Sequence, residues 1–477
     1  MTIPALRRAL LRCALAAAAC ALLPEEPAAQ RDTTVAAGAR YRAGALRNLV
    51  VGEGYRALWT QPVRVQVLNP DTFAGGLTVL QESGGLSTEG LRLQGRDGRV
   101  YQFRSVDKNV EPSLPEDLRG TLPHAVVQDM VSAKHPAAAL VVPPLLEAVG
   151  VLHAVPRLFV MPDHPFLGEH RAEFRGRLGQ LEVRPTAGDE GPRFAGAADV
   201  EGSEDLLEKL EESPNDRADA RAFLTARLMD VLVGDWDRHL DQWRWAGFDR
   251  GGVRVWLPIP RDRDNALVRQ TGLVAAVGRQ VVPMITTFGP RYGNLFGLVV
   301  HGSVLDRRIL AGVERPAWDS TAAFIRARLT DRVIDDAVRR LPPEYHAVDG
   351  ERIAGWLRAR RDLLPQAARE YYALLATEVD VRATDAAETA EVERHADGSV
   401  EVRLRAGGGG APYFRRRFVP GETREVRVFL HGGDDRAEAT GEGPARIRVR
   451  VLGGGGDDVL AGGRGTVLYD DRGDNRF

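Results

Sequence analysis

The chain has 477 residues, of which 44% are apolar and 27% are charged, so it is of the ordinary globular class and is long enough for two or three domains. Its formal net charge of −2 shows neither the basic excess of a nucleic-acid-binding protein nor an acidic tail. Nucleic acid is therefore not an expected partner, and other partners have to be inferred from candidate sites.

The first thirty residues have the pattern of a secretory signal peptide. Three arginines precede an apolar run at residues 13–23 that is too short to cross a bilayer, and Pro27–Ala29 supplies small residues for cleavage. A lipoprotein signal at Cys20 is the less favoured alternative, because the lipobox leucine is missing. We expect removal of residues 1–30 and a mature chain that is exported, to the periplasm or the cell surface. Both cysteines lie in this segment, so we expect no disulfide in the mature chain. No run of eighteen apolar residues follows it, so we also expect no transmembrane helix there.

Residues 31–70 are predicted to be a leader or linker segment with one short strand. From Gly75 the pattern changes to strands separated by glycine-rich turns, which predicts a three-stranded meander. Its strands are expected at Leu77–Gln81, Leu91–Leu93 and Val100–Val106.

Helical periodicity follows at Val126–Ala133 and at Ala137–Val149, although Pro143–Pro144 predicts a break or a late start in the second helix. A helix at Arg221–Val233 is expected to bury one apolar stripe and to lead into the loop 235–242. Further helices are predicted between about residues 319 and 377.

After about residue 380 apolar residues alternate with polar ones, which predicts strands and an all-β domain over residues 381–477. Two of its turns, Gly432–Asp435 and Gly455–Asp458, resemble one another. They are interpreted as ordinary β-turns, with one nonapeptide of a calcium-binding β-roll as the alternative.

The segment 234–243 has the residue types that a phosphoryl-transfer site needs. Asp237 is the candidate catalytic base, and Gln242, five residues later, is a candidate metal contact. His239 would hold the loop by hydrogen bonds, unless it is an ordinary core histidine. The alternative interpretation is a charged surface turn.

A second acidic group follows the strand predicted at Val253–Leu257. Asp262 or Asp264 would bind Mg²⁺ or Mn²⁺, because magnesium prefers one or two carboxylates together with phosphate oxygens. The alternative is a pair of surface carboxylates that form salt bridges with Arg261 and Arg263.

The glycine turn at 83–88, with Gly84 and Gly85, would cradle phosphates through its backbone amides, or would be a plain hairpin. Arg104 and Lys108, at the end of the next strands, are alternatives for the cation on the same phosphates. The carboxylate or amide that orients this cation is left open, and the candidates are Gln128, Asp129 and Glu147. Gln180–Glu182 is a candidate for the connection between lobes, and Glu182 for contact with a nucleotide base.

Taken in order, these elements resemble the atypical protein-kinase-like fold of HipA-type, CotH-type and secreted kinases. More closely, the segments Tyr55–Trp59, Arg104–Lys108, 234–245 and 258–264 are similar to a family of exported bacterial proteins whose longer members are linked to a metallophosphoesterase or to an outer-membrane surface-antigen barrel. The resemblance implies an α+β fold, with a two-lobed kinase-like domain at residues 71–380 and a small all-β domain after it. It also implies Asp237 as base, Gln242 in place of the usual asparagine, and ATP or another nucleotide as donor.

The expected function is metal-dependent phosphoryl transfer from a nucleotide to a hydroxyl group on an envelope protein, glycan or lipid. The alternative is a catalytically inactive kinase-like binding or assembly module that is associated with the outer membrane, with an outer-membrane protein as its partner. Nucleotide-dependent phosphate transfer separates the two.

Overall fold

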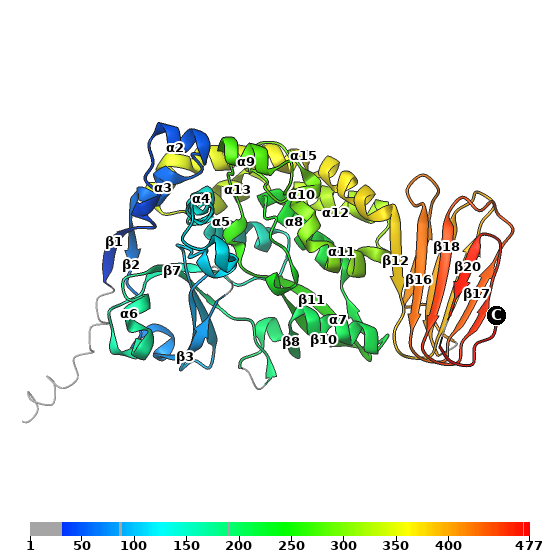
Figure 1. Cartoon of the computed structure of the whole chain (residues 1–477). Coiled ribbons are helices and arrows are strands. Elements are labelled where there is room, and N and C mark those ends of the chain that lie inside the picture. The colour runs from blue at the N-terminus through cyan, green and yellow to red at the C-terminus, as the bar shows by residue number, and fades with distance from the viewer. Residues whose placement is uncertain (1–30, 85–87, 189–190, 408, 471) are drawn as a thin grey trace, which may run out of the picture.

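The computed structural model describes residues 31–477, apart from 85–87, 189–190, 408 and 471. The expected signal peptide and Gly85 lie outside the described residues. Figure 1 shows a sheet-rich lobe, a lobe made mainly of helices, and a β-domain next to one another along the molecule. The predicted fold class, a two-lobed α+β domain followed by an all-β domain, is confirmed.

The first lobe is built on a five-stranded antiparallel sheet with the strand order β3-β4-β5-β7-β6. Its first three strands are the predicted meander. Alternate residues on these strands, such as Leu91, Leu93 and Phe103, are fully buried in a compact core. The strands are β3 (Leu77–Ser83), β4 (Gly90–Gly95), β5 (Val100–Ser105), β6 (Arg157–Val160) and β7 (Leu178–Val183).

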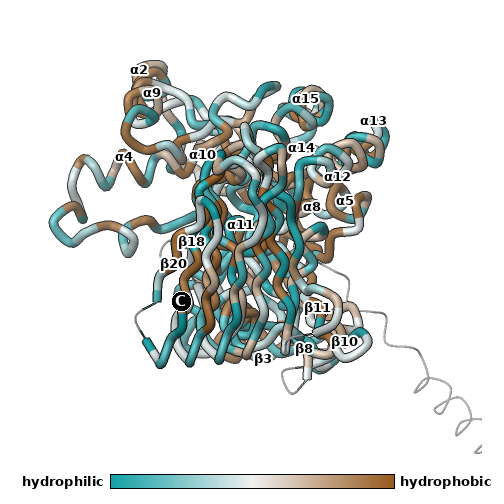
Figure 2. The backbone as a smooth tube through the Cα atoms, turned by 90° about the vertical axis from the view of Figure 1, so that its right-hand side faces the viewer, coloured by the Kyte–Doolittle hydropathy of each residue, from teal (hydrophilic) through white to brown (hydrophobic). Residues whose placement is uncertain are grey.

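The segment that was expected to be a leader is built into the fold. Strand β1 (Asp32–Ala36) pairs with β2 (Pro62–Gln66), and two short helices lie between them, α2 (Ala45–Val50) and α3 (Arg56–Thr60). Tyr55 and Trp59 are buried in the same core as the helical lobe. Figure 2 shows α2 beside α9 (Gly272–Gly278), which comes from a distant part of the chain.

The helical lobe surrounds α8 (Ala220–Val233). The predicted helix and its buried apolar residues are confirmed, but burial is not limited to one stripe, because every residue from Phe223 to Val233 is buried. The predicted break at Pro143–Pro144 was also wrong, since both prolines lie inside α5, which packs against α13. The helices of this lobe are α4 (Leu122–Met130), α5 (Ala138–Ala148), α7 (Ser203–Glu212), α10 (Leu295–Val299), α11 (Ser303–Ile309), α12 (Arg315–Arg328), α13 (Asp331–Val338), α14 (Pro343–Tyr345) and α15 (Glu351–Ala376), while the short α6 (Arg171–Phe174) lies beside the first sheet.

A second sheet positions the two acidic loops. Its strand order is β8-β10-β11-β9, with β8 (Asp199–Glu201), β9 (Asp216–Ala218), β10 (Trp243–Arg250) and β11 (Val253–Pro260). In the antiparallel hairpin, Trp243 lies opposite Pro260. The loop before β10 and the loop after β11 therefore meet at the same end of the hairpin.

The β-domain coils with mostly parallel pairing. One sheet has the order β12-β16-β18-β20, all parallel, and in the other β13, β17 and β19 are parallel, with β14 and β15 added antiparallel at one edge. Figure 2 faces the strands of this domain, which stand side by side. The strands are β12 (Glu378–Arg382), β13 (Glu388–Arg394), β14 (Val400–Ala406), β15 (Phe414–Phe418), β16 (Glu425–His431), β17 (Arg436–Thr440), β18 (Arg448–Gly454), β19 (Val459–Ala461) and β20 (Thr466–Tyr469).

The two similar turns are stacked on one another in successive coils. The backbone N–H of Asp435 donates to Asp458 Oδ1 at 2.9 Å, and that of Asp458 donates to Asn475 Oδ1 at 2.9 Å. The N–H of Glu388 in turn donates to Asp435 Oδ1 at 2.8 Å. Each acidic turn thus binds the backbone of a neighbouring coil.

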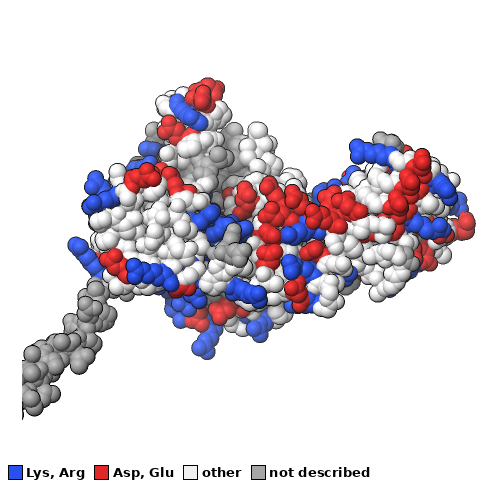
Figure 3. Space-filling model, turned by 90° about the horizontal axis from the view of Figure 1, so that it is seen from below, with Lys and Arg blue, Asp and Glu red and all other residues white. Residues whose placement is uncertain are grey.

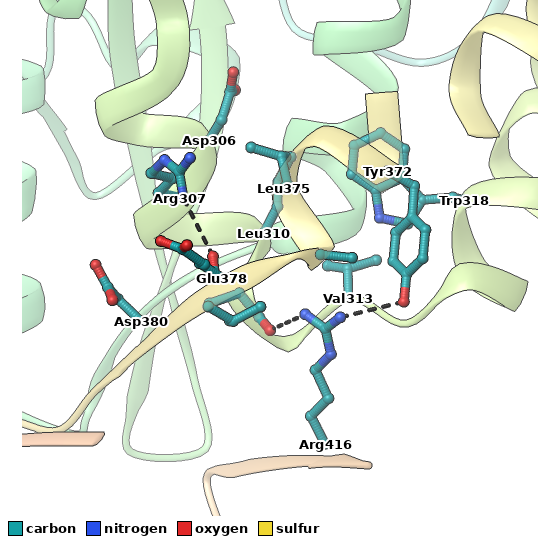
Figure 4. A pocket seen from close by; sticks show the side chains of 13 residues that line it. Asp306, Arg307, Leu310, Val313, Trp318, Tyr372, Leu375, Glu378, Asp380 and Arg416 are labelled. Carbon is teal, nitrogen blue, oxygen red and sulfur yellow. Dashed lines mark hydrogen bonds between the residues drawn. The ribbon is translucent and has the colours of Figure 1, made fainter. Parts of the chain in front are cut away.

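The helical lobe and the β-domain are joined by α15, which leads directly into β12 (Figure 1). At the junction, Arg416 of β15 donates to the Ala311 carbonyl at 2.6 Å and to the Tyr372 hydroxyl at 3.2 Å (Figure 4). The cavity beside these residues is only about 10 Å³, about the size of one water molecule, so we do not consider it a ligand site.

Seen from below, acidic side chains gather in a band near the middle of the molecule, with lysines and arginines among them and on both sides (Figure 3). Within the described residues, no helix is both long and apolar enough to cross a membrane.

Candidate active site

A cavity of about 730 Å³ lies between the first sheet and the two acidic loops. Seven of the residues that the sequence singled out line it. They are Gly84 and Arg104 from the first lobe, and Asp237, His239, Gln242, Asp262 and Asp264 from the second.

Asn265 joins the two acidic loops. Its side-chain nitrogen donates to Asp237 Oδ2 at 3.0 Å and to Asp264 Oδ1 at 2.9 Å. The candidate base and a candidate metal carboxylate therefore lie within two hydrogen-bond lengths of each other. On its other oxygen, Asp237 has His301 Nδ1 at 2.9 Å and His239 Nε2 at 3.7 Å.

The loop that carries Asp237 is held in place by a turn at its start and by hydrogen bonds from two buried arginines. α8 ends at Val233, and the left-handed backbone of the next residue, Gly234 (φ 71°), turns the chain sharply. Arg238 is fully buried and donates to the carbonyl oxygens of Gln242 at 2.7 Å and of Arg261 at 2.8 Å, so it ties the two acidic loops together. From α15, Arg360 donates to the carbonyls of Val231 and Leu232 at 2.6 and 2.7 Å, at the end of α8.

Two lysines hold Asp264. Lys108 Nζ and Lys134 Nζ lie 2.9 and 3.1 Å from Asp264 Oδ2, and Lys108 also donates to Thr88 Oγ1 at 2.6 Å. Burial alone would raise the pKa of Asp264, but the two ammonium groups outweigh it and lower the pKa well below its usual range. Burial and the neighbouring Asp264 raise the pKa of Asp262.

Both candidates for the phosphate-binding cation lie beside carboxylates. Lys108 contacts Asp264, whereas Arg104 is paired with Glu182 at 2.5 Å and lies 3.8 Å from Asp262. Among the described residues, Lys108 Nζ contacts none of Gln128, Asp129 and Glu147, so that part of the prediction was wrong.

The rejected candidates have other partners. Asp129 is paired with Arg56 and Arg47, and Gln128 donates to the Lys108 backbone carbonyl at 2.8 Å. Glu182 does not lie at a connection between lobes, because it pairs with Gln102 inside the sheet, and its side chain binds Arg104. The connection begins after Val183, where β7 ends.

The donor chemistry fits a divalent metal that is completed by phosphate oxygens. Within the described chain, no three His, Cys, Asp or Glu side chains form a metal site by themselves. Asp262 and Asp264 supply carboxylates to the cavity, and Gln242 Oε1 is buried without a hydrogen-bond partner in the described structure. One or two carboxylates plus phosphate is the set that magnesium prefers.

Four residues contribute to the site although the sequence analysis assigned them no role: Lys134, Arg238, Asn265 and His301. Lys134 and His301 lie 130 residues before Asp264 and 64 residues after Asp237, and neither stands in a recognisable motif. Arg238 and Asn265 lie inside the motifs, but residue spacing does not reveal their hydrogen bonds to the other acidic loop.

No known family model matches the sequence, and no curated protein sequence matches it. Among solved structures, the chain is similar to the Helicobacter pylori proinflammatory kinase CtkA, with 12% identity over 61% of this chain and 94% of that chain, and a TM-score of 0.33. It is also similar to HipA in the HipA–HipB–operator DNA complex of Shewanella oneidensis MR-1 (13% identity, 61% and 67% coverage, TM-score 0.31). WaaP in complex with acyl carrier protein gives 14% identity, 62% and 92% coverage, and a TM-score of 0.23. At these TM-scores the similarities do not define the site, which stands on the contacts described above.

Proposed function

We propose that the protein catalyses metal-dependent phosphoryl transfer from ATP or another phosphoanhydride to a hydroxyl group. One observation carries the proposal: a single amide, that of Asn265, holds Asp237 beside Asp264 in a cavity that also receives Lys134 and Arg104. Base, metal carboxylate and phosphate-binding cations are the parts that such a transfer requires.

The reaction follows from this arrangement. The acceptor hydroxyl donates its hydrogen bond to Asp237, and its oxygen attacks the terminal phosphorus. As the new P–O bond forms, the anhydride P–O bond breaks, the proton passes to Asp237, and the leaving phosphate keeps the bonding electrons. Lys134 and Arg104 neutralise charge on the phosphates. A divalent ion held by Asp262, Asp264 and Gln242 would add to this neutralisation.

The test is phosphate transfer by the mature protein with Mg²⁺ or Mn²⁺ and γ-labelled nucleotides, beside Asp237→Ala. We expect the variant to lose at least about 100-fold in rate, because general-base catalysis contributes about that much. Asp71→Ala is the control, since Asp71 does not line the cavity and its side chain is 74% exposed. Equal labelling by wild type and Asp237→Ala would contradict the proposal.

We also propose an envelope location, with a protein, glycan or lipid as the acceptor. It rests on the signal-peptide pattern of residues 1–30. Cell fractionation with an antibody to the β-domain tests the location. Recovery of the chain only in the cytoplasm, with its first thirty residues attached, would contradict it.

One observation favours the alternative of a binding module without turnover. Both oxygens of Asp264 are already engaged, one by two lysines and the other by Asn265. In that case the protein would bind phosphate-bearing ligands, but no donor would give transfer in wild type or variant. Docking to an outer-membrane protein would then be its role, which co-purification through the β-domain can test.

A further inference from the structure

One wall of the cavity is formed by arginines that lack partners. Arg92, Arg184 and Arg261 line the cavity, and Arg244 lies beside them. Among the described residues, none of these four guanidinium groups makes an ion pair or donates a hydrogen bond, and Arg92 Nε and Arg244 Nε are buried without a partner. We call these four residues the arginine wall.

The arginine wall is assembled from both lobes. Arg92 on β4 lies across from Gln102 on β5, which in turn lies across from Glu182 on β7, and Arg184 follows directly after β7. Arg244 lies on β10 and Arg261 follows the end of β11. The wall therefore exists only when the two sheets face each other across the cavity.

These cations repel one another. Burial and Arg92 lower the pKa of Arg244, and burial and Arg104 lower the pKa of Arg261 to about 10. The carboxylate nearest in the sheet, Glu182, is engaged by Arg104. Unpaired, half-buried cations are costly in free energy unless a ligand supplies the missing negative charge.

The cavity offers little apolar surface for a nucleotide base. Among the described residues that line it, none is aliphatic, and His239 is the one aromatic side chain. Sites for organic ligands are lined mainly by apolar and aromatic side chains, with few polar groups. Guanidinium groups, by contrast, bind phosphate oxygens in bidentate fashion.

We propose that the arginine wall binds a second phosphate group, so that the cavity accepts phosphate at both of its ends. The proposal rests on the proposed function for the first phosphate, the one that is transferred. The second phosphate comes either from a linear inorganic polyphosphate that acts as donor or from a phosphate that the acceptor already carries. With polyphosphate as donor, the acceptor oxygen bonds to the terminal phosphorus, the bridging P–O bond breaks, the shortened chain leaves with the electrons, and Asp237 takes the proton.

The first test is calorimetric binding of tripolyphosphate to the mature full chain. We expect the double variant Arg92→Gln/Arg261→Gln, which changes two arginines that line the cavity, to bind at least about tenfold more weakly, because each lost charge-assisted hydrogen bond costs more than a factor of ten. Arg250→Gln is the control, since Arg250 is an exposed residue at the end of strand β10. Unchanged affinity in the double variant would overturn the proposal.

Thermal unfolding of the same proteins excludes a folding defect. Because the arginines repel one another, we expect the double variant without ligand to melt at the same or a higher temperature than wild type, and the control not to change. A double variant that melts lower and loses binding would overturn the proposal, since the arginines would then be structural.

Transfer assays distinguish the two sources and separate this inference from the proposed function. Transfer from tripolyphosphate to a simple alcohol acceptor supports the donor source, and transfer from ATP to phosphorylated acceptors alone supports the acceptor source. Arginine-dependent binding in a protein that transfers nothing supports the arginine wall and refutes phosphoryl transfer. Efficient transfer from ATP to an unphosphorylated acceptor that the double variant leaves unchanged overturns the arginine wall and supports phosphoryl transfer.

Discussion

Asn265 keeps two carboxylates of like charge side by side. Its two N–H groups bind Asp237 and Asp264 at 3.0 and 2.9 Å. We expect Asn265→Asp to lower kcat by about 100-fold or more, because it removes the donor and adds a third negative charge where the base must stay available. Steady-state kinetics checks this, with the exposed Asn215→Asp as the matched change elsewhere. A variant that affects only KM would contradict the positioning role.

At this scale the sequence predicted the residues that belong to compact motifs. Asp237, Gln242, Asp262 and Asp264 were chosen by residue type and spacing, and the structure brings them to one cavity. Their roles stay predictions. Lys134 was not predicted, because its contact with Asp264 spans 130 residues and depends on how α4 and α5 pack.

Among the elements, the stacked turns of the β-domain carry a prediction about pH. Asp435 is 2% exposed, and one of its oxygens is buried without a partner in the described structure. Burial and the neighbouring acids Asp458, Glu388 and Asp434 raise the pKa of Asp435 from 3.8 to about 8. The folded state therefore favours the protonated carboxyl. The free energy of unfolding falls as the pH rises from about 4 to about 8, because the unfolded chain loses this proton at a lower pH than the folded protein.

Asp435→Asn should remove this dependence, because the next coil but one already uses Asn475 at the equivalent hydrogen-bonding position. We expect the variant to unfold at a higher temperature than wild type at pH 8, and the difference to shrink at pH 5. The exposed Asp474→Asn, next to Asn475, is the control. An equal difference at both pH values would refute the assignment to Asp435.

The sequence pattern predicted these strands but not how they pair. Alternation with a period of two identifies a strand that buries one face, whether its neighbour runs parallel or antiparallel. The sequence pattern was also insufficient for α5. Proline is expected to interrupt a helix, but both prolines lie inside α5, which packs against α13.

For the whole molecule, the N-terminal segment 31–66 holds the chain that follows the acidic loop. The Tyr55 hydroxyl donates to the Leu267 carbonyl at 2.6 Å, and the N–H groups of Glu53 and Gly54 donate to Thr271 Oγ1 at 3.1 and 3.3 Å. We expect Tyr55→Phe to lower the free energy of unfolding by about 1–3 kcal/mol, because it leaves a buried carbonyl unpaired. Denaturant unfolding checks this against Tyr469→Phe, since Tyr469 is 47% exposed.

The order of the lobes was predictable because each is a run of one periodicity in the sequence. The contribution of residues 31–66 was not, since their polar and small residues gave little pattern, and Tyr55 and Trp59 are buried by helices far along the chain. The arginine wall was equally hidden, because its members stand singly on four separate segments.

Helix α15 connects the β-domain to the end of α8. It has 26 residues, which is a length of roughly 39 Å at 1.5 Å per residue, and Pro365 lies inside it. Its C-terminal end leads into β12. Within the helix, Arg360 donates hydrogen bonds to the last carbonyls of α8, immediately before the loop that bears Asp237. A displacement of the β-domain would therefore pass along this helix to the hydrogen bonds of Arg360, and through them to the loop that bears Asp237.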